Sequence, residues 1–195
     1  MHKITLASLI TLFTLAQADS IRPLLQISFE SGGDELVTIQ HDYEGDYKID
    51  AGDGFTFEAG IAVDNPQSNL ELQFLAGYKI DNDDADNGDI TWSLIPLSAL
   101  ALVKVQDFKF GGGITYHISP ELDGRFGRED INYQFDSAFG GVIQAQYSFE
   151  DTFSIGLKAT FIDYKLKNDS TKTASGNSIG VVGTFKFGGT SSKYR

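Results

Sequence analysis

The segment FGGVIQAQYSFEDTFSIGLKATF, which covers residues 139–161, decides the fold class. Apolar or small side chains occupy every second position from Phe139 to Phe149, and again from Phe153 to Phe161. Successive side chains of a β-strand point to opposite faces, so this period of two predicts two strands, and helical spacing fits neither. Only a short turn at Glu150–Asp151 separates them. The segment therefore predicts an antiparallel hairpin with one apolar face.

The same alternation recurs along the chain, and it predicts eight strands in all. The other six cover residues 25–30, 55–63, 70–80, 90–104, 108–116 and 179–187. We expect the first strand to continue through 36–39 across a bend or bulge at Gly32–Gly33, and Tyr47–Asp50 to lead into the second. The strand at 90–104 contains Pro96, which predicts a bulge, because proline cannot donate to the hydrogen-bond ladder.

The connections between these strands alternate in length. Short turns are expected at 64–68, 105–107 and 150–151, and longer polar loops at 41–46, 81–89, 117–130 and 168–177. An even number of strands joined alternately by short turns and long loops is typical of a transmembrane β-barrel. We therefore predict an all-β fold, an eight-stranded antiparallel up-and-down transmembrane β-barrel in one domain.

The second face of the strands indicates what fills the barrel. It carries about one charge per strand, of both signs, mixed with Gly, Ser, Thr and Gln. A secreted soluble barrel would expose a face denser in charge, whereas a narrow lumen suits carboxylates and ammonium groups that pair with each other. We predict a lumen charge network of Glu30, Glu58, Glu71, Lys79, Lys109, Lys158 and Lys186.

Aromatic residues gather at the ends of the predicted strands. They form two predicted rings of aromatic side chains, one at each end of the strands. Two aromatic rings of this kind are typical of the membrane–water interfaces of a barrel. The ring beside the short turns is predicted to contain Phe108, Phe149, Phe153 and Phe187. The ring beside the long loops is predicted to contain Tyr78, Trp92, Tyr116, Tyr133 and Tyr164.

With these features the chain resembles the small eight-stranded outer-membrane barrels of the OmpA/OmpX type. Its last strand, at about 178–187, carries Gly183, Phe185 and Phe187 and resembles the C-terminal signal of such barrels. Here a short tail, 188–195, follows it. The resemblance implies a monomer in the outer membrane of a Gram-negative bacterium. Its expected partners are outer-membrane lipid, lipopolysaccharide and the barrel assembly machinery.

The first eighteen residues predict a signal peptide. Lys3 precedes an apolar run from Ile4 to Leu15, and Ala16-Gln17-Ala18 fits the small-x-small cleavage pattern. The run is shorter than the roughly 20 residues of a spanning helix. We therefore expect export through the inner membrane and a mature barrel domain of residues 19–195.

Composition excludes several functions. The 195 residues contain no Cys and carry a formal net charge of −12, which argues against disulfides, thiolate metal sites and a nucleic-acid partner. Residues 81–89 hold five Asp, but their spacing does not match a calcium-binding loop. We expect a solvated acidic tip there, and neither a metal nor a cofactor.

One pair of residues suggests an enzymatic alternative. His117 and Ser119 resemble the dyad of outer-membrane lipid A deacylases, with Glu129 or Asp130 as an orienting carboxylate. Pro120 stands where that family has Asn. Strand parity directs both side chains toward the lumen, whereas a lipid-cleaving site must face lipid.

We therefore predict a non-enzymatic outer-membrane barrel with a structural or surface-interaction role. The alternatives are a narrow, porin-like pore or small hydrophobic-ligand conduit, and a lipid A-modifying enzyme that uses His117 and Ser119.

Overall fold

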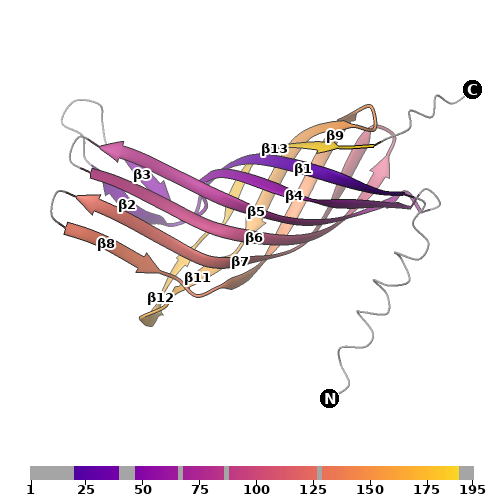
Figure 1. Ribbon diagram of the computed structural model, residues 1–195. Coiled ribbons are helices and arrows are strands. Elements are labelled where there is room, and N and C mark those ends of the chain that lie inside the picture. Colours follow the sequence, from indigo (N-terminus) through magenta and orange to yellow (C-terminus); the bar gives the residue numbers. More distant parts are fainter. Residues whose placement is uncertain (1–19, 40–46, 66–67, 86–87, 127–128, 189–195) are drawn as a thin grey trace, which may run out of the picture.

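The computed structural model describes residues 20–39, 47–65, 68–85, 88–126 and 129–188, and its core is a closed antiparallel barrel. Eight strands form the wall (Figure 1). In their order around the barrel they are β1 (Ser20–Ser31), β4 (Gly54–Asn65), β5 (Leu70–Ala85), β6 (Gly88–Val105), β7 (Phe108–Phe126), β9 (Ala138–Phe149), β10 (Phe153–Phe161) and β13 (Ser178–Lys186).

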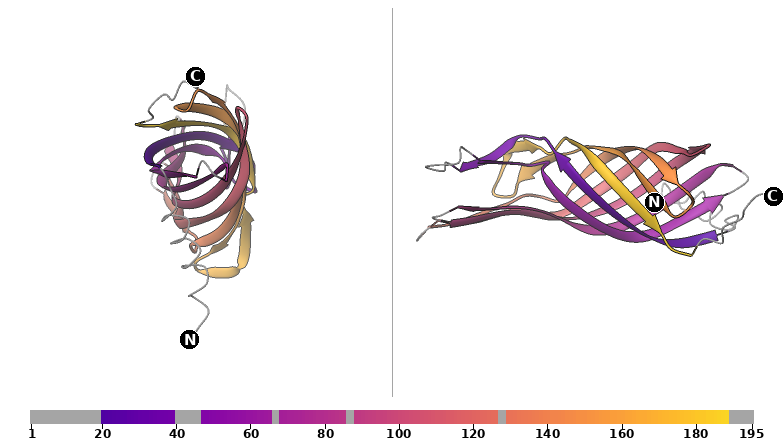
Figure 2. Two further views of the ribbon diagram at one scale, coloured as in Figure 1. Left: turned by 90° about the vertical axis from the view of Figure 1, so that its right-hand side faces the viewer. Right: turned by 90° about the horizontal axis from the view of Figure 1, so that it is seen from above.

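The first and last wall strands close the barrel. Residues 24–31 of β1 pair with residues 179–186 of β13, from Leu24 opposite Lys186 to Ser31 opposite Ile179. Seen from one end, the wall forms a ring (Figure 2, left). One end, which we call the short-turn end, holds the three tight turns together with Ser20 and Lys186. The hairpin end is the opposite one.

Side chains alternate between the outside and the inside of this wall. In β1, for example, Leu25, Ile27 and Phe29 are exposed, whereas Gln26 and Glu30 are buried. The outward positions of the eight strands between the two ends carry only apolar, aromatic or small residues. A soluble barrel would bury such side chains, so the reversed pattern confirms the predicted transmembrane barrel.

Among the described residues, no helix is long and apolar enough to cross a membrane.

The predicted long loops at 81–89, 117–130 and 168–177 are largely β-strand, so their prediction as loops was wrong. β5, β6 and β7 continue past the barrel, and β8 (Glu129–Gln134) pairs with the end of β7. The β6–β7 ladder runs without a loop as far as Gly88 opposite Phe126. Polar residues predicted loops here because these strand ends lie outside lipid, where their outward face meets water.

Two small hairpins complete the hairpin end. β2 (Glu35–Ile39) pairs with β3 (Tyr47–Asp50), and β11 (Asp163–Leu166) pairs with β12 (Asp169–Ser175). Gly32 and Gly33 have φ of 132° and 99°, which favours glycine, and a Cβ on Gly33 would lie 2.7 Å from the Gly52 nitrogen. The predicted bend at this position therefore ends the wall strand and turns the chain into a separate hairpin.

The ladders beside Pro96 are irregular in two places, but the extra residue of the bulge lies on β7, between Ile118 and Glu121, and Pro96 itself pairs with His117. The prediction of a bulge at Pro96 was therefore wrong in its strand. Opposite β7, the register of β6 shifts between Ser93 and Ile95. Opposite β5, the paired residues skip from Ala76–Leu97 to Lys79–Leu94. The missing N–H of Pro96 accounts for this gap in the ladder.

The signal peptide predicted at 1–18 lies outside the described residues, as does the tail after Gly188. The last strand ends at Lys186, one residue before the predicted boundary.

A charge on the outer wall tests whether lipid surrounds it. Leu157 is exposed at the middle of β10. We expect Leu157→Arg to lower the free energy of unfolding in lipid vesicles by about 2–4 kcal/mol, because an arginine near the bilayer midplane is poorly solvated. The measurement is a urea titration. Thr173→Arg on the exposed hairpin β11–β12 is the control, and an equal effect of both variants would argue against a lipid-facing wall.

Candidate functional site

The lumen near the short-turn end holds a group of paired charges that we call the lower ion-pair cluster. Its members are Arg22, Asp64, Glu71, Lys104, Lys109 and Lys186. The Glu71 carboxylate lies 2.8 Å from Lys186 Nζ, 3.2 Å from Lys104 Nζ and 3.6 Å from Lys109 Nζ. Arg22 and Lys104 both bind Asp64. Wall strands bring these residues together because each one lies close to a strand end at the short turns.

A second group, the upper ion-pair cluster, lies farther along the lumen and contains Glu30, Glu58, Lys79 and Lys158. Lys158 Nζ lies 3.0 Å from Glu30 and 3.3 Å from Glu58. Lys79 lies 3.9 Å from Glu30 and donates a hydrogen bond to the Gly52 carbonyl at 2.5 Å. Hydroxyl groups of Thr160 and Ser178 donate to the second oxygen of Glu30, so its acceptor sites are well occupied.

An uncharged layer separates the two clusters. Leu24 lies between Arg22 and Glu30 along β1, and Leu75 lies between Glu71 and Lys79 along β5. The layer also includes Ala62, Leu100 and Val142, and amide hydrogen bonds join Gln26, Gln144, Gln146 and Thr184 beside it. The lumen is thus packed in layers, as expected of eight strands.

The structure places all seven predicted network residues inside the barrel, but in two clusters rather than one. Sequence reasoning missed Arg22, Asp64 and Lys104. They lie near the ends of β1, β4 and β6, at positions where the alternation of inward and outward side chains continues to point inward. Extending this alternation to the strand ends would have identified them.

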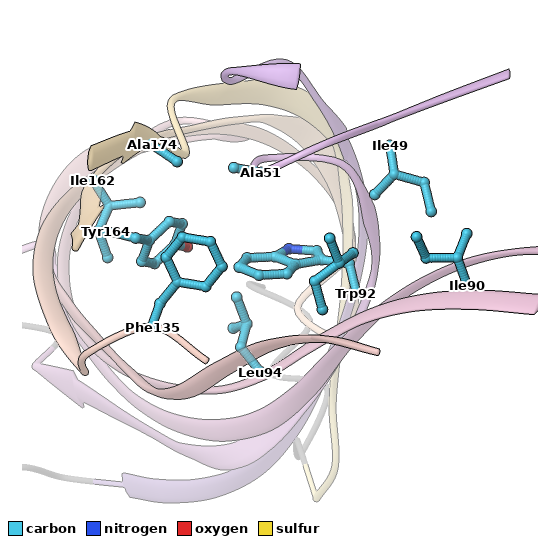
Figure 3. Packing of buried hydrophobic residues seen from close by; sticks show 10 residues of the cluster. Ile49, Ala51, Ile90, Trp92, Leu94, Phe135, Ile162, Tyr164 and Ala174 are labelled. Atoms are coloured by element: carbon cyan, nitrogen blue, oxygen red, sulfur yellow. The ribbon is translucent and has the colours of Figure 1, made fainter. Parts of the chain in front are cut away.

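An apolar cluster lies inside the hairpin end of the lumen (Figure 3). This apolar cap consists of Ile49, Ala51, Ile90, Trp92, Leu94, Leu122, Phe135, Ile162, Tyr164 and Ala174. The Trp92 ring meets the rings of Phe135 and Tyr164 edge-on, with centroids 5.5 Å and 5.6 Å apart. These residues come from β3 and the turn after it, β6, β7, the segment before β9, the junction of β10 with β11, β11 and β12, so the cap joins the hairpins to one another.

The prediction that Trp92 and Tyr164 belong to the outer aromatic ring was wrong. Their side chains are 0% and 1% exposed and lie inside the cap. Trp92 shares the inward parity of Leu94 and Ser98, and Tyr164 shares that of Lys158. The position of both residues at strand ends suggested the outer aromatic ring. The alternation of side chains along each strand decides instead that they point inward.

The other predicted ring residues are not buried, although one lies outside the ring. Phe108, Phe149, Phe153, Phe187 and Tyr78 face outward, and Tyr116 is half-buried against Phe139. Tyr133 is exposed on β8, where it pairs with Leu122, beyond the level of Tyr116. Sequence reasoning missed the exposed Phe29, Phe55, Phe139 and Phe161 near the hairpin end.

His117 and Ser119 do not form a dyad. His117 is buried, and a hydrogen bond of 2.6 Å joins its Nδ1 to the Tyr164 hydroxyl. Ser119 has a φ of 48° and is exposed, because the bulge of β7 at this point reverses the parity of the strand. Of the two residues, only His117 faces the lumen, and its hydrogen bond to Tyr164 links the lumen to the apolar cap.

The surface of the β7–β8 hairpin is polar and acidic. Glu121 accepts hydrogen bonds from Asn132 at 2.6 Å and from Gln134 at 3.0 Å, and these bonds hold the pKa of its carboxyl below the usual range. Asn132 also donates to Asp123. Within the part of the chain that the structure describes, no group of three or more His, Asp or Glu side chains could hold a metal ion. The side chains of Asp83, Asp84 and Asp86 in the predicted acidic tip lie outside that part.

A closed antiparallel wall with an apolar outside and a polar inside defines the transmembrane β-barrels, and eight strands place this chain among the smallest of them. Its architecture is that of small outer-membrane barrels. Neisserial surface protein A matches with a TM-score of 0.50 and 14% sequence identity, over 87% of this chain and 99% of its own. Ail, the attachment invasion locus protein of Yersinia pestis, matches with a TM-score of 0.53 and 10% identity, over 86% of this chain and 99% of its own. No protein-family description and no curated protein sequence matches the chain.

The lower ion-pair cluster gives a direct test of the lumen. Glu71→Gln keeps the size of the side chain but removes the carboxylate that faces three lysines. Removing one partner of a buried pair costs about 3–5 kcal/mol, so we expect a loss of that size in the free energy of unfolding in lipid vesicles.

The exposed Glu150 at a short turn provides the matched control, and Glu150→Gln should change stability by less than about 0.5 kcal/mol. Adding Lys109→Met to Glu71→Gln should recover part of the loss, since it removes one unpaired charge. An unaltered stability of Glu71→Gln would show that Glu71 does not balance these lysines.

Proposed function

We propose that the protein is a non-enzymatic, non-conducting outer-membrane barrel whose role is to hold a rigid, acidic hairpin surface outside the membrane. The observation that carries this proposal is the apolar cap, because it places packed apolar side chains in the lumen and joins several hairpins to one another. Hairpins that are held in one arrangement present a preorganised surface, which reduces the entropic cost of binding a partner.

The packing of the lumen favours this role over the pore or conduit. Between the two ion-pair clusters lie amide and apolar layers, and the cavity bordered by Pro96, His117 and Lys158 has a volume of only about 10 Å³. That is room for one water molecule. Buried charges that are paired and hydrogen-bonded stabilise a filled interior, which supports a lumen without a continuous aqueous path.

The charge of the hairpin end indicates the kind of partner. Residues 31–53, 81–93, 117–137 and 162–177 contain 19 of the 27 Asp and Glu but only 6 of the 15 Lys and Arg. Of these, 15 acidic and 5 basic residues belong to the described part of the chain, so the described hairpin end carries an acidic excess outside the membrane. A surface of one sign attracts partners of the other sign and repels its own. We infer that the partner presents a cationic surface.

This charge distinguishes the chain from one of its structural neighbours. One structure of Ail contains the heparin analogue sucrose octasulfate, which is a polyanion. The acidic hairpins here favour the opposite ligand charge, so the shared fold is expected to serve a different partner.

The remaining parts of the proposal follow from the sequence and the lipid-facing wall. They are export by the signal peptide at 1–18, insertion as a monomer by the barrel assembly machinery of a Gram-negative bacterium, and contact with outer-membrane lipid and lipopolysaccharide. The exposed apolar wall supports the membrane location, because water would not tolerate so large an apolar surface.

The cap is tested by removing its central ring. Trp92→Ala should lower the free energy of unfolding by about 3–5 kcal/mol, since it leaves a cavity among packed side chains. Trypsin should then cleave the hairpins of Trp92→Ala faster than those of the natural chain, while the barrel keeps its heat-modifiable migration in detergent gels.

Tyr133→Ala removes an exposed aromatic ring from β8 and is the control that should leave both readouts unchanged. Planar-bilayer recordings of the natural chain should show no channel openings. Steady conductance that changes in Glu71→Ala or Lys109→Ala would overturn the closed barrel and support the pore instead.

The partner charge is tested with oligolysine and heparin on the protein in lipid nanodiscs. We expect oligolysine to bind and heparin not to bind, with oligolysine affinity falling as salt rises. Glu121→Gln with Asp123→Asn should weaken oligolysine binding severalfold. Glu150→Gln with Asp151→Asn removes the same charge at the short-turn end and should not. Equal effects of the two double variants, or tighter binding of heparin, would contradict a cationic partner.

A further inference from the structure

The outer wall has a groove on the side formed by β4, β5, β6 and β7, which lie side by side in Figure 1. Its volume is about 430 Å³. Three alanines on adjacent strands, Ala59, Ala76 and Ala99, give it a shallow floor. Most other outward positions carry Phe, Leu, Ile, Val or Tyr, so the groove exists because small residues coincide on these strands.

Larger side chains border the groove. Ile61, Phe74 and Leu97 lie along it, and Tyr116 and Phe139 stand at the end nearer the hairpins. The rings of Tyr116 and Phe139 are 4.4 Å apart and contact each other. The groove therefore starts at the level of the outer aromatic ring and runs obliquely across the wall to Ile61 and Phe74, which pair with each other four residues from the short-turn ends of β4 and β5.

The groove also lies next to the irregular part of the ladder. Ala76–Leu97 is the last β5–β6 pair before the gap that Pro96 creates. On the other side of β6, Leu97 pairs with Tyr116, close to the bulge of β7. Regular pairing resumes only at Lys79–Leu94, so the upper end of the groove coincides with the one place in the described β5–β6 ladder where pairs are skipped.

We propose that this groove binds one acyl chain of a membrane lipid. The groove is continuous with the lipid-facing wall, and its exposed lining carries no charge. A void in hydrocarbon loses dispersion contacts on its lining, and a flexible acyl chain can restore them. The groove is open toward the lipid and bordered by the rings of Phe74, Tyr116 and Phe139, so a single chain can lie along it. The site would hold this chain longer than the flatter remainder of the wall does.

This inference depends on the transmembrane fold and not on the proposed surface role, so either can fail alone. The chain's wall offers a matched comparison. Ala145 also faces outward, on β9, but does not line the groove. Phenylalanine at Ala76 or Ala99 fills the groove, whereas phenylalanine at Ala145 adds the same ring elsewhere.

The experiment uses the whole protein in nanodiscs that contain a phospholipid with a photoactivatable group in its acyl chain. After irradiation, labelled peptides are mapped by mass spectrometry. We expect labelling to concentrate severalfold on the peptides that carry Ala76, Ala99 and Tyr116, relative to the outward positions of β10. Ala76→Phe and Ala99→Phe should reduce this labelling to the level of β10, and Ala145→Phe should leave it unchanged.

Heat-modifiable migration establishes that each variant is folded. Uniform labelling around the barrel would overturn the proposal, as would unchanged labelling of folded Ala76→Phe and Ala99→Phe. Cross-links between two copies at these positions would assign the groove to a second chain and would equally overturn it.

Discussion

The pairing of β1 with β13 is the constraint on which the rest of the structure depends. Within a bilayer no water is available to satisfy exposed backbone N–H and C=O groups, so an open sheet edge would be costly. Closing the edge forces the strands into a ring and sends alternate side chains into a narrow interior. That interior then receives charged residues, which are stable there only in pairs such as Lys158 with Glu30 and Glu58.

Strand periodicity predicted the barrel because lipid imposes a strict alternation. In segments such as 139–149 and 153–161, every outward position must be apolar or small and every inward one must fit the lumen. The same alternation identified seven lumen charges. It did not reveal which charges pair, because strand tilt and register bring together residues that are distant in sequence, such as Glu71 and Lys186.

Beyond the membrane, the sequence pattern no longer distinguished strand from loop. The ends of β6 and β7 have water on one side and the apolar cap on the other, and their polar residues resemble those of loops. The bulge at Ser119 also reverses the parity of β7, so that Leu122 enters the cap. Neither the extension of these strands beyond the membrane nor the bulge at Ser119 changes the local residue composition, so the sequence pattern did not reveal them. The prediction for Trp92 and Tyr164 was wrong for a related reason. It rested on their position at strand ends, whereas the face of the strand decides whether a side chain points into the lumen or outward.

The position of Trp92 has a consequence for spectroscopy. It is the single tryptophan of the chain, and it lies in the cap with its indole Nε1 buried and without a hydrogen-bond partner among the described residues. Tryptophans of membrane proteins commonly sit at the interface and report on lipid. Here the intrinsic fluorescence reports instead on the packing of the hairpins, and brominated lipids would quench it little. Emission and barrel formation can therefore be followed as separate events in one refolding experiment.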